Sequence, residues 1–557
     1  MLNIIPPPAE LHLTGKKFRP STLSVRKICS PGLKSEEYGL EISENKILLR
    51  YSAPAGLRYA RQTLNQIRKL CPDGLPGLVI HDAPAFARRG VMLDVSRGRV
   101  WTMRHFKETI RKLARWKYNL LQLYFESAYA SPGNEEIWTG MSPVTPSELK
   151  ELEIYAATYG IELSVCQNCF GHLTRFLIHP KYRHLAEIQP GMVYEAWGRM
   201  SAVPQTLAPG NPESVQFVRR LLNSYFIACR SPHVNLGCDE TLDLGFGVSR
   251  GEAGKKGLSA IFADYVGKLC TAVSEAGRRP MIWADFPMKH PDVIELLPKH
   301  LVYLLWGYDA DTPFRSWCET IRSSGNEFWV CPGSCSWSSL FGNVARRQAN
   351  MRKAAEDGLA GGASGYLLTD WGDGGHRQCW GPSLAAIAEG ACFAWSGPVE
   401  LNRDAIAGEA FGSIAAGQWY DRAGHVEDDL AAVGLPGLYA DLHIPWHQIP
   451  EKQQTSDAAA YQALIPRLEK LHRDVPADVS SLLQREMRMA AGFAIFAAER
   501  AVLRREGRAL ELKSLAVRMA PLIREFQRLW LRRSRPGGLT WSSAQWRKIA
   551  DEMDNIC

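Results

Sequence analysis

The sequence has no apolar run long enough to cross a lipid bilayer, and its longer apolar runs all contain charged residues. Its first residues also lack the basic segment, apolar core and small-residue cleavage site of a secretory leader. These absences argue against a membrane partner and predict a cytoplasmic location. A content of 46% hydrophobic and 22% charged residues is typical of a soluble globular protein.

Cysteine pairs that could form a disulfide framework or a zinc site are also missing. The thirteen cysteines are an odd number without regular spacing, which favours reduced thiols. Cys166 and Cys169 form a C-x-x-C pair, but no second pair has matching spacing, because three residues and not two separate Cys331 from Cys335. The sequence therefore predicts neither a metal nor a cofactor.

The net charge of +8 is not concentrated in one segment. The densest basic stretch, RLWLRRSRPGG at residues 528–538, is more typical of an exposed helix end than of a nucleic-acid surface. We therefore expect no nucleic-acid partner.

The length of 557 residues is ample for a barrel with additions at both ends. Residues 1–86 are predicted to form a small α+β domain, because residues 36–53 alternate like strands and residues 56–70 have helical periodicity. Residues 401–557 lack strand signals and are predicted to form a helical domain. Residues 478–507 are interpreted there as a long amphipathic helix. These helices could pack against the barrel or against a second subunit, so a homodimer is one expected arrangement.

Residues 87–400 contain apolar runs that alternate with helical patterns. Eight such units favour a (β/α)8 barrel over a doubly wound sheet, so the predicted fold is α/β. The predicted strands cover residues 91–95, 119–125, 161–166, 233–237, 281–284, 301–306, 328–331 and 366–369. Residues 185–212, rich in Gly and Pro, are expected to form a loop across the top of the barrel.

The segment PHVNLGCDETLDLG, residues 232–245, is typical of a barrel strand that delivers acidic side chains to an active site. Adjacent acids such as Asp239 and Glu240 more often form a solvated turn, but ionised groups after a buried strand are costly unless they have a use. On extended backbone their side chains would point to opposite faces, so they could hold two different atoms of one substrate but could not flank a single bond.

Polar and aromatic residues follow the other predicted strands as well. Four tryptophans beside an acidic pair favour a sugar site, although each alone is more often a packing residue, and barrel interiors favour Val, Ile and Leu. The candidates are Arg89, Asp94 and Arg97 around strand one, Glu126 after strand two, Gln167, Asn168 and His172 after strand three, Trp283 and Asp285 after strand five, Trp306 and Tyr308 after strand six, Trp337 after strand seven, and Asp370, Trp371, Asp373 and His376 after strand eight.

Five motifs, in this order, resemble the catalytic barrel of glycoside hydrolase family 20, the exo-β-N-acetylhexosaminidases. They are RRGVMLDVSRG, QLYFES, FGHL, HVNLGCDET and TDWGDGGH. AGLRYARQTLNQI resembles the end of the small domain that precedes this barrel, so the resemblance covers residues 35–395. It implies an enzyme that removes terminal GlcNAc or GalNAc from oligosaccharides or glycoconjugates. The 2-acetamido oxygen of the substrate acts as the nucleophile, so the configuration is retained.

The resemblance also implies roles for single residues. Glu240 is the general acid and later the base, Asp239 accepts a hydrogen bond from the acetamide N–H, and His172 supports the acid together with Glu126. Arg89 and Asp373 bind outer hydroxyls, and Trp283, Trp306 and Trp371 wall the acetamide pocket. The alternatives are a surface arginine for Arg89, a structural histidine for His172 and a solvated acid for Asp373.

One feature departs from the family pattern. The tyrosine that commonly follows strand seven is missing, and Trp337 or Tyr308 could replace its hydroxyl as a donor. The departure leaves two further readings open. One is a related glycosidase with another sugar preference, and the other is a carbohydrate-binding protein on an inactive barrel. The intact acid pair argues against the second.

Overall fold

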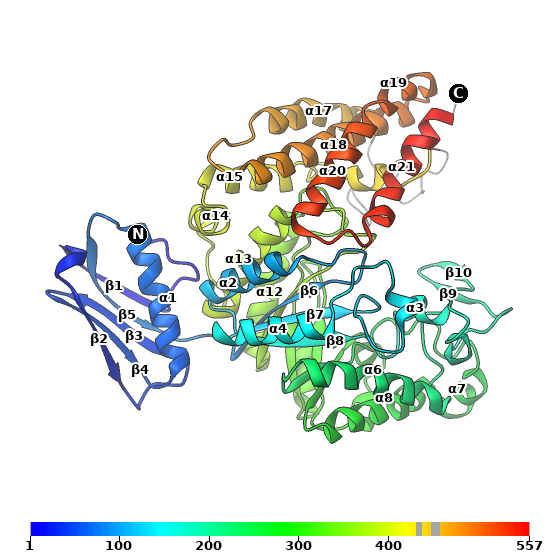
Figure 1. Ribbon diagram of the computed structural model, residues 1–557, viewed down its shortest axis with the longest axis horizontal. Helices are drawn as coiled ribbons and strands as arrows, with labels where there is room; N and C mark the ends of the chain where they lie inside the picture. Colours follow the sequence, from blue (N-terminus) through cyan, green and yellow to red (C-terminus); the bar gives the residue numbers. More distant parts are fainter. Residues whose placement is uncertain (1, 431–436, 447–456, 556–557) are drawn as a thin grey trace.

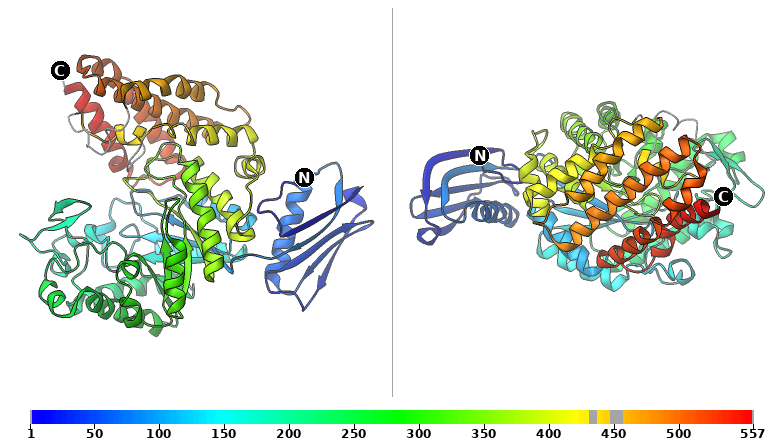
Figure 2. Two further views of the ribbon diagram at one scale, coloured as in Figure 1. Left: turned by 180° about the vertical axis from the view of Figure 1, so that it is seen from behind. Right: turned by 90° about the horizontal axis from the view of Figure 1, so that it is seen from above.

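The computed structural model describes residues 2–430, 437–446 and 457–555. An α+β domain stands at one end of the molecule, a barrel forms its middle, and a layer of helices lies along one side of the barrel (Figures 1 and 2). The predicted fold class, a (β/α)8 barrel between a small α+β domain and a helical C-terminal region, is confirmed. Among the described residues no helix combines the length and apolar character needed to span a bilayer.

The N-terminal domain is a five-stranded sheet in the order β1-β5-β3-β4-β2, with one long helix. Helix α1 (Pro54–Leu70) packs on the sheet through buried Tyr59, Leu64 and Ile67. The strands are β1 (Glu10–Phe18), β2 (Ser24–Cys29), β3 (Tyr38–Ser43), β4 (Lys46–Tyr51) and β5 (Leu75–Asp82).

The barrel is closed by eight parallel strands, and each predicted strand has its counterpart. Pairing between β15 and β6 joins the last strand to the first. The strands are β6 (Arg88–Asp94), β7 (Leu120–Phe125), β8 (Glu162–Gln167), β11 (His233–Asn235), β12 (Arg279–Trp283), β13 (Val302–Trp306), β14 (Glu327–Cys331) and β15 (Gly365–Asp370).

Helices follow every barrel strand and cover the outside of the barrel. The longer ones are α2 (Met103–Arg115), α4 (Pro146–Thr158), α6 (Pro212–Ala228), α8 (Leu258–Glu275), α11 (Phe314–Ser323), α12 (Val344–Gly361) and α13 (Trp380–Ser396). The shorter ones are α3 (Glu135–Trp138), α5 (Thr174–Leu177), α7 (Arg250–Lys256), α9 (Asp285–Lys289) and α10 (Val293–Leu296). The long loop expected at residues 185–212 also contains a small hairpin of β9 (Tyr194–Ala196) and β10 (Arg199–Ser201).

The C-terminal helices surround α18 (Ser481–Arg505), which is buried on most sides. Its solvent-facing side is narrower than the amphipathic interpretation implies. Arg485 and Arg488 are exposed, whereas buried Glu486 and Arg504 pair with Arg533 and Asp441. The other helices are α14 (Arg403–Phe411), α15 (Ile414–Gly424), α16 (Gly437–Asp441), α17 (Ala458–Arg473), α19 (Leu512–Ala516), α20 (Met519–Arg533) and α21 (Leu539–Asn555).

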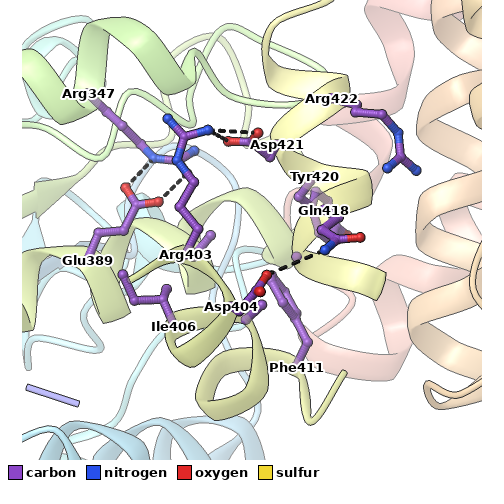
Figure 3. A pocket seen from close by; sticks show the side chains of 13 residues that line it. Arg347, Glu389, Arg403, Asp404, Ile406, Phe411, Gln418, Tyr420, Asp421 and Arg422 are labelled. Carbon is purple, nitrogen blue, oxygen red and sulfur yellow. Dashed lines mark hydrogen bonds and ion pairs between the residues drawn. The ribbon is translucent and has the colours of Figure 1, made fainter. Parts of the chain in front are cut away.

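Paired polar side chains lie between these helices and the helices of the barrel. A cavity of about 340 Å³ lies between α12, α13, α14 and α15. Figure 3 shows the side chains that line it. Two arginines in this cavity are paired. Arg347 donates two hydrogen bonds to Glu389 at 2.8 and 2.7 Å, and Arg403 donates to Asp421 at 3.0 and 2.9 Å. None of the predicted site residues lines the cavity, which we interpret as part of the packing between the two domains.

A second contact holds the loop between β15 and α13. Arg377 on this loop donates from Nε to the carbonyl of Ser542 at 2.8 Å and from Nη1 to the hydroxyl of Tyr439 at 3.2 Å. The same loop carries Trp371 and Asp373. The C-terminal helices therefore help to fix one side of the site described next.

Candidate active site

The acidic pair follows the shortest barrel strand, β11, which has three residues. The backbone beyond it is left-handed at Gly237 (φ +67°), Cys238 (φ +67°) and Glu240 (φ +48°). A Cβ at Gly237 would lie 1.8 Å from Oδ1 of Asn168, so glycine lets this side chain approach closely. The same oxygen accepts the N–H of Cys238 at 3.0 Å, which ties the end of β11 to the neighbouring strand β8.

This backbone brings both carboxylates to one histidine. Oδ2 of Asp239 and Oε2 of Glu240 each lie 3.3 Å from Nε2 of His172. The prediction that the two side chains point to opposite faces is therefore wrong. Alternation requires extended backbone, and the left-handed conformation of Glu240 interrupts it.

His172 lies among three carboxylates. Its other ring nitrogen, Nδ1, is 3.7 Å from Oε1 of Glu126. Burial alone would lower the pKa of His172, but the charges of Asp239, Glu240 and Glu126 outweigh burial and raise the pKa well above its usual value. Burial would likewise raise the pKa of Asp239, yet the charge of His172 lowers it. The geometry therefore favours a positively charged imidazole beside an ionised Asp239.

Asp285 completes the acidic cluster from the next strand. Its Oδ2 accepts the backbone N–H of Glu240 at 3.0 Å. Burial, together with the charge of Asp239, raises the pKa of Asp285 to about 6. The sequence places Asp285 after strand five, but its contact with Glu240 could not be inferred, because it depends on the turn after β11.

The arginine at this end of the barrel is Arg97. Its Nη1 lies 3.1 Å from Oδ2 of Asp94, and its Nη2 lies 3.1 Å from Oε1 of Glu126. Its guanidinium carbon lies 5.1 Å from the ring centre of Trp371. Burial raises the pKa of Asp373, and the charge of Arg97 opposes this effect.

The prediction that Arg89 binds substrate is wrong. Arg89 lies at the start of β6, whereas the acid pair follows the C-terminal end of β11, so the two are at opposite ends of the parallel barrel. Its side chain is fully buried and donates two hydrogen bonds to Glu36 at 2.7 and 3.0 Å. Further bonds go to the carbonyls of Phe86 and Lys117 and to the hydroxyl of Tyr59. Arg89 therefore joins the barrel to the N-terminal domain.

The predicted aromatic residues gather at the C-terminal end of the barrel. Trp283 and Trp371 are buried with ring centres 5.9 Å apart, and half-buried Trp306, Tyr308 and Trp337 pack against the same cluster. The hydroxyl of Tyr308 accepts the indole N–H of Trp371 at 2.7 Å. The ring of Tyr308 also contacts Trp306 (5.3 Å) and Trp337 (5.0 Å), so it lies at the centre of the aromatic wall.

Several polar atoms of this region are buried without a hydrogen-bond partner among the described residues. They include Oδ1 of Asp239, Oδ1 of Asp285, and the indole Nε1 atoms of Trp283 and Trp306. Buried polar groups are normally satisfied, so such atoms indicate a place for a polar ligand. A cavity of about 460 Å³ adjoins Asp285, Trp306 and Tyr308.

The two cysteines of the C-x-x-C pair pack in different clusters. Cys166 packs inside the barrel, and Cys169 packs between the barrel and its outer helices. No group of three or more His, Cys, Asp or Glu side chains that could hold a metal is found in residues 2–430, 437–446 and 457–555.

Comparisons with known proteins agree with this geometry. Residues 86–334 match the sequence model described as "Glycosyl hydrolase family 20, catalytic domain". The barrel of this chain is therefore a family 20 catalytic domain, and the chain is a glycoside hydrolase. The matched segment ends before β15, so Trp371 and Asp373 lie outside it.

Two relatives show how far the similarity extends. This family 20 chain is 22% identical to a beta-N-acetylhexosaminidase of Cellulomonas fimi over 477 residues, which are 77% of this chain and 87% of the relative. It is 26% identical to hexosaminidase D of Homo sapiens over 207 residues, 35% of this chain and 39% of that protein.

A solved structure supports the fold. The family 20 exo beta-N-acetylglucosaminidase of Vibrio harveyi, in complex with N-acetylglucosamine, has a TM-score of 0.59 and 16% identity to this chain. The likeness covers 76% of each chain.

Proposed function

We propose that this enzyme releases β-linked GlcNAc or GalNAc from the non-reducing ends of short oligosaccharides or glycoconjugates, with the substrate's acetamide as nucleophile. The observation that carries the proposal is the arrangement of Asp239 and Glu240 around His172, with Oδ1 of Asp239 open to a donor. The reaction needs no cofactor.

Glu240 acts on the glycosidic oxygen. Its carboxylic acid protonates this oxygen while the acetamide oxygen attacks the anomeric carbon, so the glycosidic bond breaks and an oxazolinium ion forms. The Glu240 carboxylate then takes a proton from water while the water oxygen attacks the anomeric carbon. This attack opens the oxazolinium ring and restores the original configuration. The half-buried side chain of Glu240 is 30% exposed, so water can reach it for the second step.

Asp239 holds the acetamide group. Its open Oδ1 can accept the acetamide N–H, and its negative charge stabilises the positive charge that develops on the oxazolinium ring. His172 holds Oδ2 of the same carboxylate, which fixes its orientation and keeps it ionised.

Arg97 and Asp373 bind the outer hydroxyls of the terminal sugar. The planar guanidinium of Arg97 is already held by Asp94 and Glu126, so its direction is fixed before the sugar arrives. The carboxylate of Asp373 offers acceptors, whereas Arg97 offers donors, and a sugar hydroxyl can use both.

Trp283, Trp306 and Trp371 form the walls of the acetamide pocket, and Tyr308 takes the place of the missing tyrosine. Its hydroxyl accepts from Trp371 and so has its own proton available for the acetamide oxygen. The presence of Trp337 after β14 favours a second candidate, a related glycosidase with another sugar preference.

We also propose a cytoplasmic location and imported glycan fragments as substrates. Support comes from the cysteines of the described residues, which are unpaired and mostly buried. A homodimer through the C-terminal helices is a further proposal, and sedimentation velocity tests it.

The test is hydrolysis of aryl β-GlcNAc, β-GalNAc and β-glucoside by wild type, Asp239→Ala and the control Asp264→Ala. Asp264 is exposed on α8 and pairs with Lys268, so its loss should leave activity unchanged. We expect activity on the acetamido sugars alone, with collapse only in Asp239→Ala. Wild-type activity on the glucoside would favour the second candidate, and wild-type inactivity on all three would overturn the proposal.

A further inference from the structure

The loop between β8 and α6 carries an aromatic residue in a strained position. Strands β9 and β10 pair as a hairpin whose turn is Trp197–Gly198. Both turn residues are left-handed, with φ +49° at Trp197 and +73° at Gly198. Two-residue turns of this type favour Asn-Gly or Asp-Gly, because a bulky side chain is disfavoured at positive φ.

Packing within the described chain does not compensate for this strain, because the side chain of Trp197 is 70% exposed. Met200 on the same hairpin is 67% exposed, and Val193 and Val203 at its base are 54% and 50% exposed. A strained residue retained at an exposed position indicates a contact with something outside the chain.

The base of the hairpin is bonded to the loop that carries the general acid. Tyr194 and Ala196 pack against Ile188 and Leu242, two residues beyond Glu240. The side chain of Gln205, just after the hairpin, donates to the carbonyl of Glu240 at 3.3 Å. The backbone N–H groups of Gln205 and Thr206 donate to Asp243 at 3.0 and 3.1 Å.

The hairpin also lies at the catalytic end of the barrel. Figure 1 shows it beside the loops that follow β7 and β8, on the side away from the N-terminal domain. Glu240 must face the leaving group, since it protonates the glycosidic oxygen. An element fixed to the Glu240 loop is therefore placed on the leaving-group side of the site.

We propose that Trp197, together with Met200, binds the leaving part of the substrate. The occupant is a sugar ring beyond the scissile bond, whose apolar face stacks on the indole. Exposed Glu195 pairs with Met200 across the hairpin, so it lies on the same face and offers an acceptor to the hydroxyls of this sugar. This inference rests on the proposed function, because it needs Glu240 to act as the acid.

The test variant is Trp197→Asn, because asparagine suits the turn better than tryptophan. It should fold at least as stably as wild type and hydrolyse an aryl β-GlcNAc, which has no second sugar, at the wild-type rate. On a β-linked trisaccharide of GlcNAc we expect kcat/KM to fall about 5- to 20-fold, mainly through KM. Trp197→Phe should recover part of the loss. Leu510→Asn, at an 85% exposed position on the C-terminal domain, is the control.

Three results would overturn the inference. The first is an unchanged kcat/KM of Trp197→Asn on the trisaccharide. The second is an equal loss on the aryl substrate, which would mean that the hairpin only supports the Glu240 loop. The third is a change of oligomeric state in sedimentation velocity, which would make Trp197 a contact between copies of the chain. Failure of the proposed function is distinguishable from all three, because wild type would then hydrolyse neither acetamido substrate.

Discussion

Nε2 of His172 and Oδ2 of Asp239 lie 3.3 Å apart on loops that follow two different barrel strands. The contact raises the pKa of His172 against the effect of burial and lowers the pKa of Asp239. The same ring nitrogen also lies 3.3 Å from Oε2 of Glu240. Protonation of His172 is thus linked to the ionisation of Asp239.

This link predicts how stability depends on pH. A raised pKa makes the contribution of His172 complete below its unfolded value of about 6.5, and the contribution is lost as pH rises through the folded value. The contribution of Asp239 is complete above about 3.9 and is lost as pH falls. The free energy of unfolding that His172→Asn removes should therefore be larger at pH 5.5 than at pH 9 in urea unfolding. Equal losses at both pH values would show that the pair is not charged in the folded protein.

Glu240→Gln should separate substrates by their leaving groups. Loss of general-acid help should lower turnover on a natural disaccharide about 10²- to 10⁴-fold. The loss should be smaller for an activated aryl leaving group, which hardly needs a proton to depart. Parallel assays of kcat on both substrates give the answer, and equal losses would count against Glu240 as the acid.

Arg97→Lys should change substrate binding, whereas Arg89→Lys should change stability. Lysine at position 97 keeps the charge but loses the fixed pair of donors, so KM for aryl β-GlcNAc should rise about 10-fold or more. Lysine at position 89 leaves buried carbonyl groups without donors, so the free energy of unfolding should fall by about 1–3 kcal/mol while KM stays unchanged. Urea unfolding measures the free energy of unfolding of both variants, and steady-state kinetics measures their KM. A raised KM in Arg89→Lys would restore Arg89 to the site.

The barrel could be predicted because its strands are buried on both faces. A run such as Val302–Trp306 is almost continuously apolar, and charged residues directly after such a run mark the catalytic end. The strands at the edges of the N-terminal sheet gave no such signal, because most residues of β1 and β2 are exposed.

The predictions for Arg89 and for the directions of Asp239 and Glu240 were wrong for one physical reason. Each depends on the residue at which a strand ends, and the sequence does not define that residue closely enough. Arg89 and Arg97 lie in the same motif, and only the length of β6 decides which one reaches the catalytic end. Nothing about glutamate favours positive φ, so the left-handed turn at Glu240 has no sequence signal. That turn in turn creates the contact with Asp285.

The last prediction concerns the tyrosine that replaces the missing one. Tyr308→Phe removes the acceptor of the indole N–H of Trp371, and a buried N–H without a partner costs about 1–3 kcal/mol. It also removes the donor assigned to the acetamide oxygen. We therefore expect kcat/KM for aryl β-GlcNAc to fall about 10-fold or more.

The matched control for this change is Tyr303→Phe on β13, the strand that precedes Tyr308. The hydroxyl of Tyr303 is buried and has no hydrogen-bond partner among the described residues, so its removal should leave both stability and kcat/KM unchanged. If Tyr308→Phe also keeps its kcat/KM while Trp337→Phe loses it, the donor is the indole of Trp337. That result would place the acetamide oxygen nearer to Trp337 than to Tyr308.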